Sequence, residues 1–295
     1  MAKPEVRAAT EDDLAAIAAV AAATGQVEEW SGSDPAYVRH LLAHGQVMVA
    51  EHRAAGARGT VTGFGATRRI GAGPAAVTML CDLFVDPGAH GRGTGRALLA
   101  ALWEPGTPRM TFSSLHAHAL PLYTRAGLDA WWPLLYLGGD VGALPRAPGW
   151  TVATTSPEEV AALEAEWTGI DRSADHRAWA ARPGGQPVTA RRGTAVRGDA
   201  VLAAGTVAGE DAEYGIAHLA ISPAAGDGDA VDAVLAVLAS LDPAGGRGRV
   251  CLPAPHPATR PLLAAGWHVD FMDVFMATEP GLLDPRRAVP SPAMA

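Results

Sequence analysis

Three glycines at alternate positions follow an apolar, strand-like run and lead into a segment rich in alanine and leucine. The run covers residues 76–85, and the glycines are Gly91, Gly93 and Gly95. Because glycine has no Cβ atom, the amide groups of such a loop can approach a ligand closely. A helix that begins at this point adds unpaired N–H groups and a partial positive charge. The sequence therefore predicts a strand, a loop suited to an anion, and a helix.

Two arginines, Arg92 and Arg96, stand beside the predicted helix start and add full positive charges. Two familiar nucleotide-binding loops do not fit this stretch. It lacks the Gly-Lys-Ser/Thr ending of a triphosphate-binding loop and the Gly-x-Gly-x-x-Gly spacing of a dinucleotide-binding turn. The spacing alone leaves two interpretations open, an anion-binding loop and a plain tight connection between a strand and a helix.

Two segments of the first half resemble landmarks of one enzyme family. Residues 90–95, His-Gly-Arg-Gly-Thr-Gly, resemble the Gln/Arg-x-x-Gly-x-Gly/Ala motif of the GCN5-related N-acetyltransferases, the GNAT family. His90 replaces the usual arginine or glutamine, which alters one side-chain contact and leaves the backbone loop intact. Residues 120–128, which include Tyr123, resemble the family's Leu-Tyr-x-x-x-Gly-Phe-like segment, with Leu128 in place of Phe. Because both landmarks occur at the family's separation, the chain is identified as a member of this family.

The predicted elements of the first half follow the order of the GNAT fold. Strands are expected at residues 6–9, 47–51, 60–67, 76–85, 109–115 and 132–137. Helices are expected between Thr10 and Gly25, around residues 37–42, at residues 94–102 and at residues 120–125. The fold class is therefore α/β with a mixed sheet, of the α+β kind. Each domain is expected to be a central, mostly antiparallel sheet flanked by helices.

The second half of the chain repeats the first. Residues 219–223 fall on residues 83–87 at a distance of 136 positions, and the register continues without a gap through Leu235, which falls on Leu99. A composition break at residues 146–149 separates the halves. We therefore expect two tandem GNAT-like domains, a catalytic one at 1–145 and a degenerate one at 150–285, followed by a flexible tail at 286–295.

The second copy has lost the residues that favour an anion. At the same distance, Gly91, Gly93 and Arg96 are replaced by Asp227, Asp229 and Asp232. Leu262 stands at the landmark position of Tyr123. We expect the second copy to be a structural partner, and one chain to bind one coenzyme A through its first domain.

The composition excludes two classes of partner. The net charge is −8 and no basic cluster is long, so neither nucleic acid nor an anionic membrane surface is expected to bind. No stretch of about 18 apolar residues occurs, and no signal-peptide core is visible. Cys81 and Cys251 lie in apolar runs and are expected to be reduced. We expect a cytoplasmic protein that is a monomer or a homodimer.

The resemblance implies which residues bind the acyl donor, acetyl-CoA or another acyl-CoA. In family members, the main chain of the strand before the glycine loop holds the thioester carbonyl, and the loop amides hold the pyrophosphate. His116 lies seven residues before Tyr123, where the family often has a cofactor-contacting asparagine. The expected cofactor-binding residues are Leu83, Phe84, Val85, His90, Gly91, Arg92, Gly93, Thr94, Gly95, Arg96 and His116.

The resemblance also assigns an acid. Tyr123 matches the tyrosine that commonly protonates the departing thiolate, a role that suits a neutral phenol. The alternative is a packed ring with a satisfied hydroxyl group.

The general base and the acceptor site remain open. By position, Glu51 and Asp82 are the expected catalytic carboxylates, and Glu28, Glu29, His116 and His118 are further candidates for the base. Glu28, Glu29 and Trp30 are expected to hold a cationic acceptor, although they also fit a solvated loop. His116 and His118 lack a third nearby ligand, so no metal is expected.

The expected function is transfer of an acyl group to an amine of a small molecule, by direct attack within a ternary complex. Two alternatives stay open. The first is a non-catalytic protein that binds or senses acyl-CoA. The second is a GNAT-fold enzyme that uses a hydroxyl acceptor or a longer acyl-CoA. Tyr123 favours an enzyme, because a pure binder has no evident need for a proton donor there.

Overall fold

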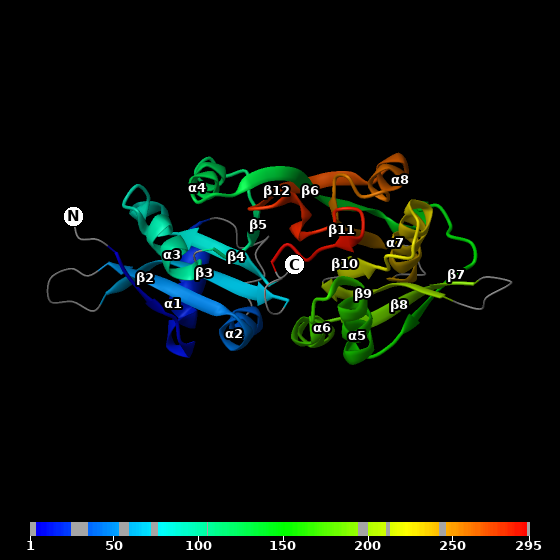
Figure 1. The fold of residues 1–295 in the computed structure, drawn as a ribbon, viewed down its shortest axis with the longest axis horizontal. Coiled ribbons are helices and arrows are strands. Elements are labelled where there is room, and N and C mark those ends of the chain that lie inside the picture. The colour runs from blue at the N-terminus through cyan, green and yellow to red at the C-terminus, as the bar shows by residue number, and fades with distance from the viewer. Residues whose placement is uncertain are drawn as a thin grey trace. The chain divides into compact units, whose positions relative to one another are not determined.

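The computed structural model describes residues 4–24, 35–52, 59–71, 76–104, 106–193, 200–210, 213–241 and 246–293. Contacts between residues divide the chain into two compact units. The first unit contains Met1–Phe112, Leu122–Leu128 and Ala277–Glu279, and the second contains Ser113–Pro121, Asp129–Met276 and Pro280–Ala295. Figure 1 follows the strands and helices along the chain from blue to red.

The sheet of the first unit has the strand order β1-β2-β3-β4-β5. Neighbouring strands are antiparallel, except that β5 runs parallel to β4. The strands are β1 (Glu5–Ala8), β2 (Gln46–His52), β3 (Thr60–Ile70), β4 (Val77–Val85) and β5 (Arg109–Ser113). The helices are α1 (Leu14–Ala23), α2 (Pro35–His44), α3 (Thr94–Leu102) and α4 (Ala119–Arg125), with short 3-10 turns at η1 (Glu11–Asp13) and η4 (Pro87–Ala89).

Helix α3 forms where the sequence predicts it because its large apolar side chains share one face. Leu98, Leu99 and Leu102 are at most 3% exposed, which is the spacing of a helix packed on one side. Gly63 on β3 allows the close approach of this helix. A Cβ atom at Gly63 would lie only 3.1 Å from Thr94 Cγ2. The start of α3 is therefore fixed against the strands.

The sheet of the second unit has the strand order β12-β6-β11-β10-β9-β8-β7, and β13 pairs with β10 outside this path. The strands are β6 (Asp129–Asp140), β7 (Trp150–Thr154), β8 (Gln186–Arg192), β9 (Ala200–Glu210), β10 (Glu213–Ile221), β11 (Arg247–Pro253), β12 (His268–Ala277) and β13 (Ala288–Val289). The helices are α5 (Pro157–Thr168), α6 (Ser173–Ala180), α7 (Asp227–Leu241) and α8 (Thr259–Ala264), with 3-10 turns η5 (Val141–Ala143) and η6 (Pro280–Leu282).

Each unit contains a piece from the other half of the sequence. In the second unit, β6 pairs antiparallel with β11 from Arg247 opposite Asp140 to Pro253 opposite Leu134. In the first unit, Thr278 lies beside Arg109 and donates its N–H to the Arg109 carbonyl oxygen at 2.9 Å. The sequence analysis did not anticipate this exchange. The domain bounds 1–145 and 150–285 stay a prediction about the repeat.

The segment at 286–295 was expected to be loose, and the structure corrects this expectation. Ala288 and Val289 form β13, which pairs antiparallel with Ala220 and Leu219 of β10. The side chain of Val289 is fully buried. The segment is held because β10 has a strand edge to pair with, a fact that local composition does not reveal. None of the described helices is long and apolar enough to cross a membrane.

Candidate functional site

Strand β4 loses one of its two neighbouring strands halfway along its length. Its parallel pairing with β5 ends at Leu80, which lies opposite Thr111. In the pairing with β3, the register shifts between Leu80 and Asp82, so Cys81 is an extra residue in a β-bulge. A bulge bends its strand and increases the local twist. Beyond it, residues 82–85 continue to pair with β3.

The loop after β4 is braced by two contacts to its own backbone. The Asp86 carboxylate accepts the N–H of Gly88 at 2.7 Å, which closes the turn at Pro87. The His90 ring nitrogen Nε2 lies 2.9 Å from the Val85 carbonyl oxygen. Because that oxygen can only accept, Nε2 carries the proton in this contact. His90 therefore ties the loop to the strand end, a contact that the sequence analysis did not predict.

Two glycines of the loop have a left-handed backbone. The φ angles are 73° at Gly91 and 82° at Gly93, a conformation that costs other residues roughly 1–2 kcal/mol. In the described structure, no atom lies within 4 Å of a Cβ atom built at either position. The space beside these two glycines is therefore open. These glycines are therefore needed for the backbone conformation, and they leave room for a ligand.

The start of α3 has the charge that an anion requires. Arg92 and Arg96 are exposed, and no ion pair is recorded for either within the described parts of the chain. The first amide groups of a helix also lack intrahelical partners and carry partial positive charge. Thr94 is 1% exposed, and its Oγ1 lies 3.4 Å from His52 Nε2. The buried Thr94 anchors the helix start, and the arginines remain available.

Helix α4 packs along α3, with Leu122 at the first turn of α3 and the Tyr123 ring near Trp103 at its C-terminal end. A Cβ atom on Gly95 would lie 3.4 Å from Leu122 Cδ2, so α4 packs on the first turn of α3. Tyr123 is 7% exposed, and its ring centroid is 6.4 Å from that of Trp103. Gly127, with a φ of 90°, ends α4 directly afterwards. The two sequence landmarks therefore meet in space.

Asp82 is held by a tyrosine from α2. Its carboxylate Oδ2 accepts a hydrogen bond of 2.7 Å from Tyr37 Oη, and both residues are buried. Asp82 directly follows the bulge of β4, and its catalytic role stays a prediction.

Glu51 has a different surrounding. Its Oε1 accepts a hydrogen bond of 2.7 Å from Arg7 Nε, and Arg7 also donates two bonds of 2.8 Å to Asp13. The hydrogen bonds from Arg7 lower the pKa of Asp13 to about 2, and both acids raise the pKa of Arg7. Glu51 is therefore one member of a bidentate ion-pair group that joins β1, η1 and β2.

The contacts of the described residues do not place five of the predicted site residues beside the glycine loop. His116 and His118 belong to the segment grouped with the second unit, and their ring centroids are 5.4 Å apart. Glu28, Glu29 and Trp30 lie outside the described residues. The roles of all five therefore stay predictions.

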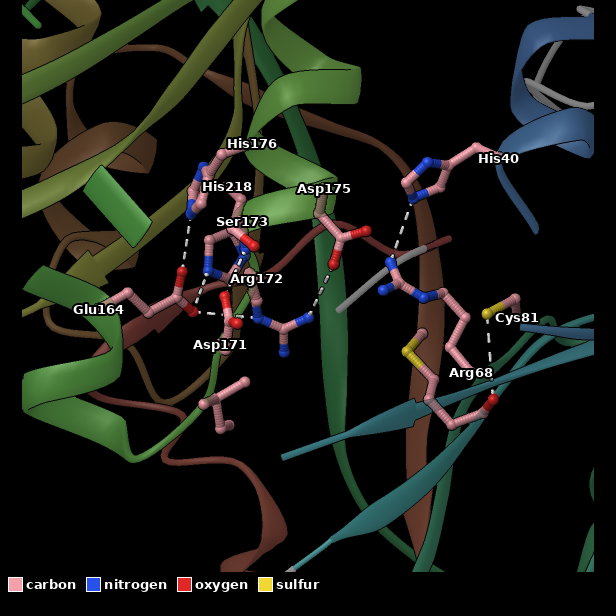
Figure 2. A network of polar contacts seen from close by, with 12 residues as sticks. His40, Arg68, Cys81, Glu164, Asp171, Arg172, Ser173, Asp175, His176 and His218 are labelled. Atoms are coloured by element: carbon pink, nitrogen blue, oxygen red, sulfur yellow. Dashed lines mark hydrogen bonds and ion pairs between the residues drawn. The ribbon is translucent and has the colours of Figure 1, made fainter. Parts of the chain in front are cut away.

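The second unit contains a buried polar cluster that the sequence analysis missed (Figure 2). Its centre is Glu164 on α5, which is 2% exposed. Oε1 accepts hydrogen bonds from Arg172 Nε at 3.0 Å and from His218 Nε2 at 2.9 Å, and Oε2 accepts one from His176 Nε2 at 2.8 Å. The His176 Nδ1 atom lies 2.9 Å from Thr206 Oγ1. We call these five residues the Glu164 cluster.

The geometry of the Glu164 cluster fixes its protonation. Burial alone would raise the pKa of Glu164, but its interactions with His218, His176 and Arg172 hold it well below the usual range. Burial lowers the pKa of His218, whose Nδ1 has no hydrogen-bond partner in the described structure. Neutral His218 avoids an unsatisfied buried N–H at that atom. His218 stands 136 positions after Asp82, so the second copy replaces an acid with a neutral imidazole.

The described ranges contain no group of three or more His, Cys, Asp or Glu side chains that could hold a metal ion. Cys81 and Cys251 are free thiols. Burial raises the pKa of Cys251 to about 12, so this thiol stays neutral.

Comparison with protein families and solved structures gives a consistent result. Residues 43–127 match the acetyltransferase (GNAT) domain model. No curated protein matches the chain. A Pyrococcus horikoshii protein named as an acetyltransferase is 15% identical, with a TM-score of 0.68, and the match covers 100% of this chain and 95% of that one.

Two further structures share the fold. A tandem GNAT protein from the clavulanic acid biosynthesis pathway is 16% identical, with a TM-score of 0.59 and coverage of 96% of this chain and 100% of that one. A GCN5-related glucosamine N-acetyltransferase region of a fungal multi-domain β-N-acetylglucosaminidase is 13% identical, with a TM-score of 0.68 and coverage of 94% and 38%. These likenesses confirm the predicted fold class and its tandem organisation.

Proposed function

We propose that this chain, whose residues 43–127 match the GNAT acetyltransferase domain and which has the tandem fold, is an N-acetyltransferase whose first copy is catalytic. The acyl donor is acetyl-CoA and the acceptor is an amine of a small molecule. The observation that carries the proposal is the loop at the start of α3. It combines two left-handed glycines with two exposed arginines for which no ion pair is recorded among the described residues.

The residues at this loop fit the phosphate end of an acyl-CoA. The amides from Gly91 to Gly95 and the side chains of Arg92 and Arg96 would hold the pyrophosphate, with the helix dipole adding to their charge. His90 would act through its contact to Val85, by keeping the loop in place. The backbone of residues 83–85 lies where β4 has left β5, which leaves its edge available for the acyl arm.

The direction of the Val85 N–H in β4 follows from the hydrogen-bonding pattern of the strand. Asp86 donates its N–H to the Thr62 carbonyl oxygen of β3 at 2.9 Å. Because successive N–H groups of a strand point to opposite edges, the N–H of Val85 points away from β3. We assign this N–H to the thioester carbonyl oxygen, where it would stabilise negative charge that develops during transfer.

Two side chains would move the protons. Acetyl-CoA would supply an acyl group that is already activated as a thioester. Asp82 would accept a proton from the ammonium form of the acceptor, and Tyr37 would hold the Asp82 carboxylate in position. Tyr123 would donate its phenolic proton to the departing thiolate. We prefer Asp82 to Glu51 as the base, because Asp82 directly follows the bulge at which the pairing of β4 with β5 has ended.

The activity itself is tested by thiol release from acetyl-CoA in the presence of a panel of small amines. We expect release that depends on one class of amine. A protein that binds acetyl-CoA and releases no thiol with any amine would support the non-catalytic alternative. Release with alcohols or with longer acyl-CoA donors would support the other alternative. The proposal includes a cytoplasmic location, consistent with the two free thiols.

Replacing Gly93 by Asp should weaken acetyl-CoA binding by about 10- to 150-fold while the protein stays folded. A like-charge pair about 5 Å apart costs roughly 3 kcal/mol at an effective dielectric near 20, and solvent exposure would halve this. Isothermal titration with acetyl-CoA measures the change.

The matched control for Gly93→Asp is Gly106→Asp. Gly106 has a φ of 80° and, like Gly93, no atom within 4 Å of a built Cβ. This variant introduces the same charge and the same backbone strain away from the loop, so acetyl-CoA should bind as it does to the unchanged protein. Equal weakening in both variants would mean that the loop has no special role.

Replacing Asp82 by Asn removes the proposed base, so it should lower turnover about 100-fold, raise the KM for the amine about tenfold and leave acetyl-CoA affinity unchanged. Tenfold corresponds to about 1.4 kcal/mol, which is within the range of one hydrogen bond to a charged group. Steady-state kinetics with both substrates measures this. The control is Asp13→Asn, which removes another buried carboxylate of the same unit and should lower stability alone. A parallel loss for both substrates in Asp82→Asn would indicate structural damage.

A further inference from the structure

The C-terminal segment of the chain, residues 280–293, which we call the tail here, packs on strand β10 of the second copy. After η6, the chain forms β13, in which Val289 is opposite Leu219 and Ala288 is opposite Ala220 of β10. The N–H of Ile221 donates to the Arg287 carbonyl oxygen at 2.8 Å. The tail therefore adds a strand to β10.

Strand β13 pairs with β10 beyond the point at which the pairing of β10 with β11 ends. The parallel pairing of β10 with β11 ends at Ile216, opposite Val250, and Ala217 is an extra residue in a bulge. These positions lie 136 residues after Leu80 and Cys81, where β4 leaves β5 and bulges. Strand β13 also lies against β11. It therefore occupies the separation between β10 and β11.

The match extends to individual residues. Leu219, Ala220 and Ile221 are the counterparts of Leu83, Phe84 and Val85 at the same distance. The backbone agrees as well, because Ser222 donates its N–H to Leu202 of the neighbouring strand, as Asp86 does to Thr62. The Ile221 N–H, which bonds to the tail, is thus the counterpart of the Val85 N–H that we assign to the acyl donor.

The tail also supplies charge to the loop before α7. Arg286 forms an ion pair with Asp227 and donates to the Pro255 carbonyl oxygen at 3.4 Å. Arg287 donates to the Gly226 carbonyl oxygen at 3.3 Å. Asp229 forms an ion pair with Arg192 of β8. Two acids that replace the anion-binding residues of the first copy are therefore neutralised by arginines of the chain itself.

We propose that residues 280–289 are a built-in ligand of the second copy and take the place that acyl-CoA takes in the first. Strand β13 pairs with the edge of β10 that corresponds to the edge of β4 assigned to the acyl arm. Arg286 pairs with Asp227, which stands where the first copy is proposed to bind the pyrophosphate. The identity of the replaced ligand rests on the proposed function, whereas the docking of the tail rests on its own contacts. Because the tail is tethered, its effective concentration is about millimolar, so a free ligand competes poorly.

The proposal changes the reason why the second copy is closed to coenzyme A. Repulsion by Asp227 and Asp229 is reduced by their arginine partners. The tail still occupies the site when Asp227 and Asp229 are replaced by other residues. Removing the acids alone should therefore not create a second acetyl-CoA site.

The test compares two neighbouring amides by hydrogen exchange. Ile221 donates to the tail and Ser222 donates to Leu202 of β9, so of these two amides release of the tail exposes Ile221 and leaves Ser222 bonded. In a chain that ends at Glu279, Ile221 should exchange at least tenfold faster while Ser222 is unchanged. A synthetic peptide of residues 280–293 should bind this chain one to one and restore the protection. A chain that ends at Pro292 is the control and should behave as the full chain.

Two results would overturn the proposal. In one, Ile221 stays protected in the folded chain that ends at Glu279, or that chain takes up no peptide. In the other, Ile221 and Ser222 lose protection together. Should the shortened chain fail to fold, Val289→Asp in the full chain gives the same comparison, because it places a charge at a fully buried position. If Ile221 and Ser222 both lose protection in this variant, the tail is part of the hydrophobic core and the proposal is wrong. Acetyl-CoA titration is read separately, so absence of any binding would count against the proposed function alone.

Discussion

Tyr123→Phe should lower turnover by about 10- to 1000-fold and leave acetyl-CoA affinity unchanged. The hydroxyl group acts on negative charge that builds on the leaving sulfur, and this charge is absent from the bound ground state. The expected loss corresponds to about 1.4–4.1 kcal/mol of transition-state stabilisation. The phenyl ring keeps its packing near Trp103, so folding should be little affected. Turnover at saturating amine and direct titration with acetyl-CoA measure the two effects.

The control for Tyr123→Phe is a second tyrosine whose hydroxyl is bonded. Tyr136 on β6 donates to Asp273 at 2.7 Å in the second unit. Tyr136→Phe should lose a little stability and keep its turnover. If Tyr123→Phe also stays within twofold of the unchanged protein, Tyr123 is a packed ring and not the acid.

Glu164→Ala should lower the free energy of unfolding of the second unit by about 3–5 kcal/mol. The substitution removes the carboxylate that Arg172 Nε and two histidines donate to, and leaves the buried Arg172 with Asp175 at 3.8 Å. Urea unfolding measures the loss. Glu158→Ala on the same helix is the control, because its ion pair with Arg177 is exposed and such pairs contribute only about 0–1 kcal/mol. Equal small losses in both variants would show that the Glu164 cluster contributes little.

The pH dependence gives a second measure of the Glu164 cluster. The pKa values of Glu164 and His218 are both lower in the folded chain than their ordinary values. The unfolded chain therefore binds more protons, and stability rises with pH in this range. The contribution of His218 should be complete above about pH 6.5, its ordinary value, and should be lost as the pH falls. Glu164→Ala should flatten the profile below about pH 4.5, the ordinary value of Glu164, and should leave or steepen the His218 part, because Glu164 raises the pKa of His218 against its burial.

The local elements of the first half follow from the sequence because their signals are local. The apolar run at residues 76–85 became β4, and the helix expected at residues 94–102 became α3. The positive φ angles at Gly91 and Gly93 agree with the loop predicted from their spacing. Periodicity and glycine positions report on the backbone of their own segment, and here they were sufficient.

Other features depended on pairing, which local patterns do not encode. The strand expected at residues 132–137 exists as part of β6, but nothing in its sequence states that its neighbour is β11. The tail was expected to be flexible, yet two of its residues pair with an edge of β10. A strand pattern predicts a strand and leaves its partner open.

The Glu164 cluster was missed for a different reason. A single acid on a helix is usually on the surface. One signal was present. Glu164 lies four positions after Val160, on the face that becomes buried, and an acid on an apolar face needs a buried partner. Arg172, His176 and His218 supply that partner.

The exchange of chain segments also determines when each unit can be finished during synthesis. Arg109 of the first unit is bonded to Thr278, 169 residues later. At about 5–20 residues per second, the ribosome needs roughly 8–34 s to deliver that partner. Strand β6 likewise waits for β11, which begins at Arg247. The nascent first half therefore leaves the ribosome with unpaired strand edges, and protection of these edges during that interval becomes a requirement for producing the folded chain.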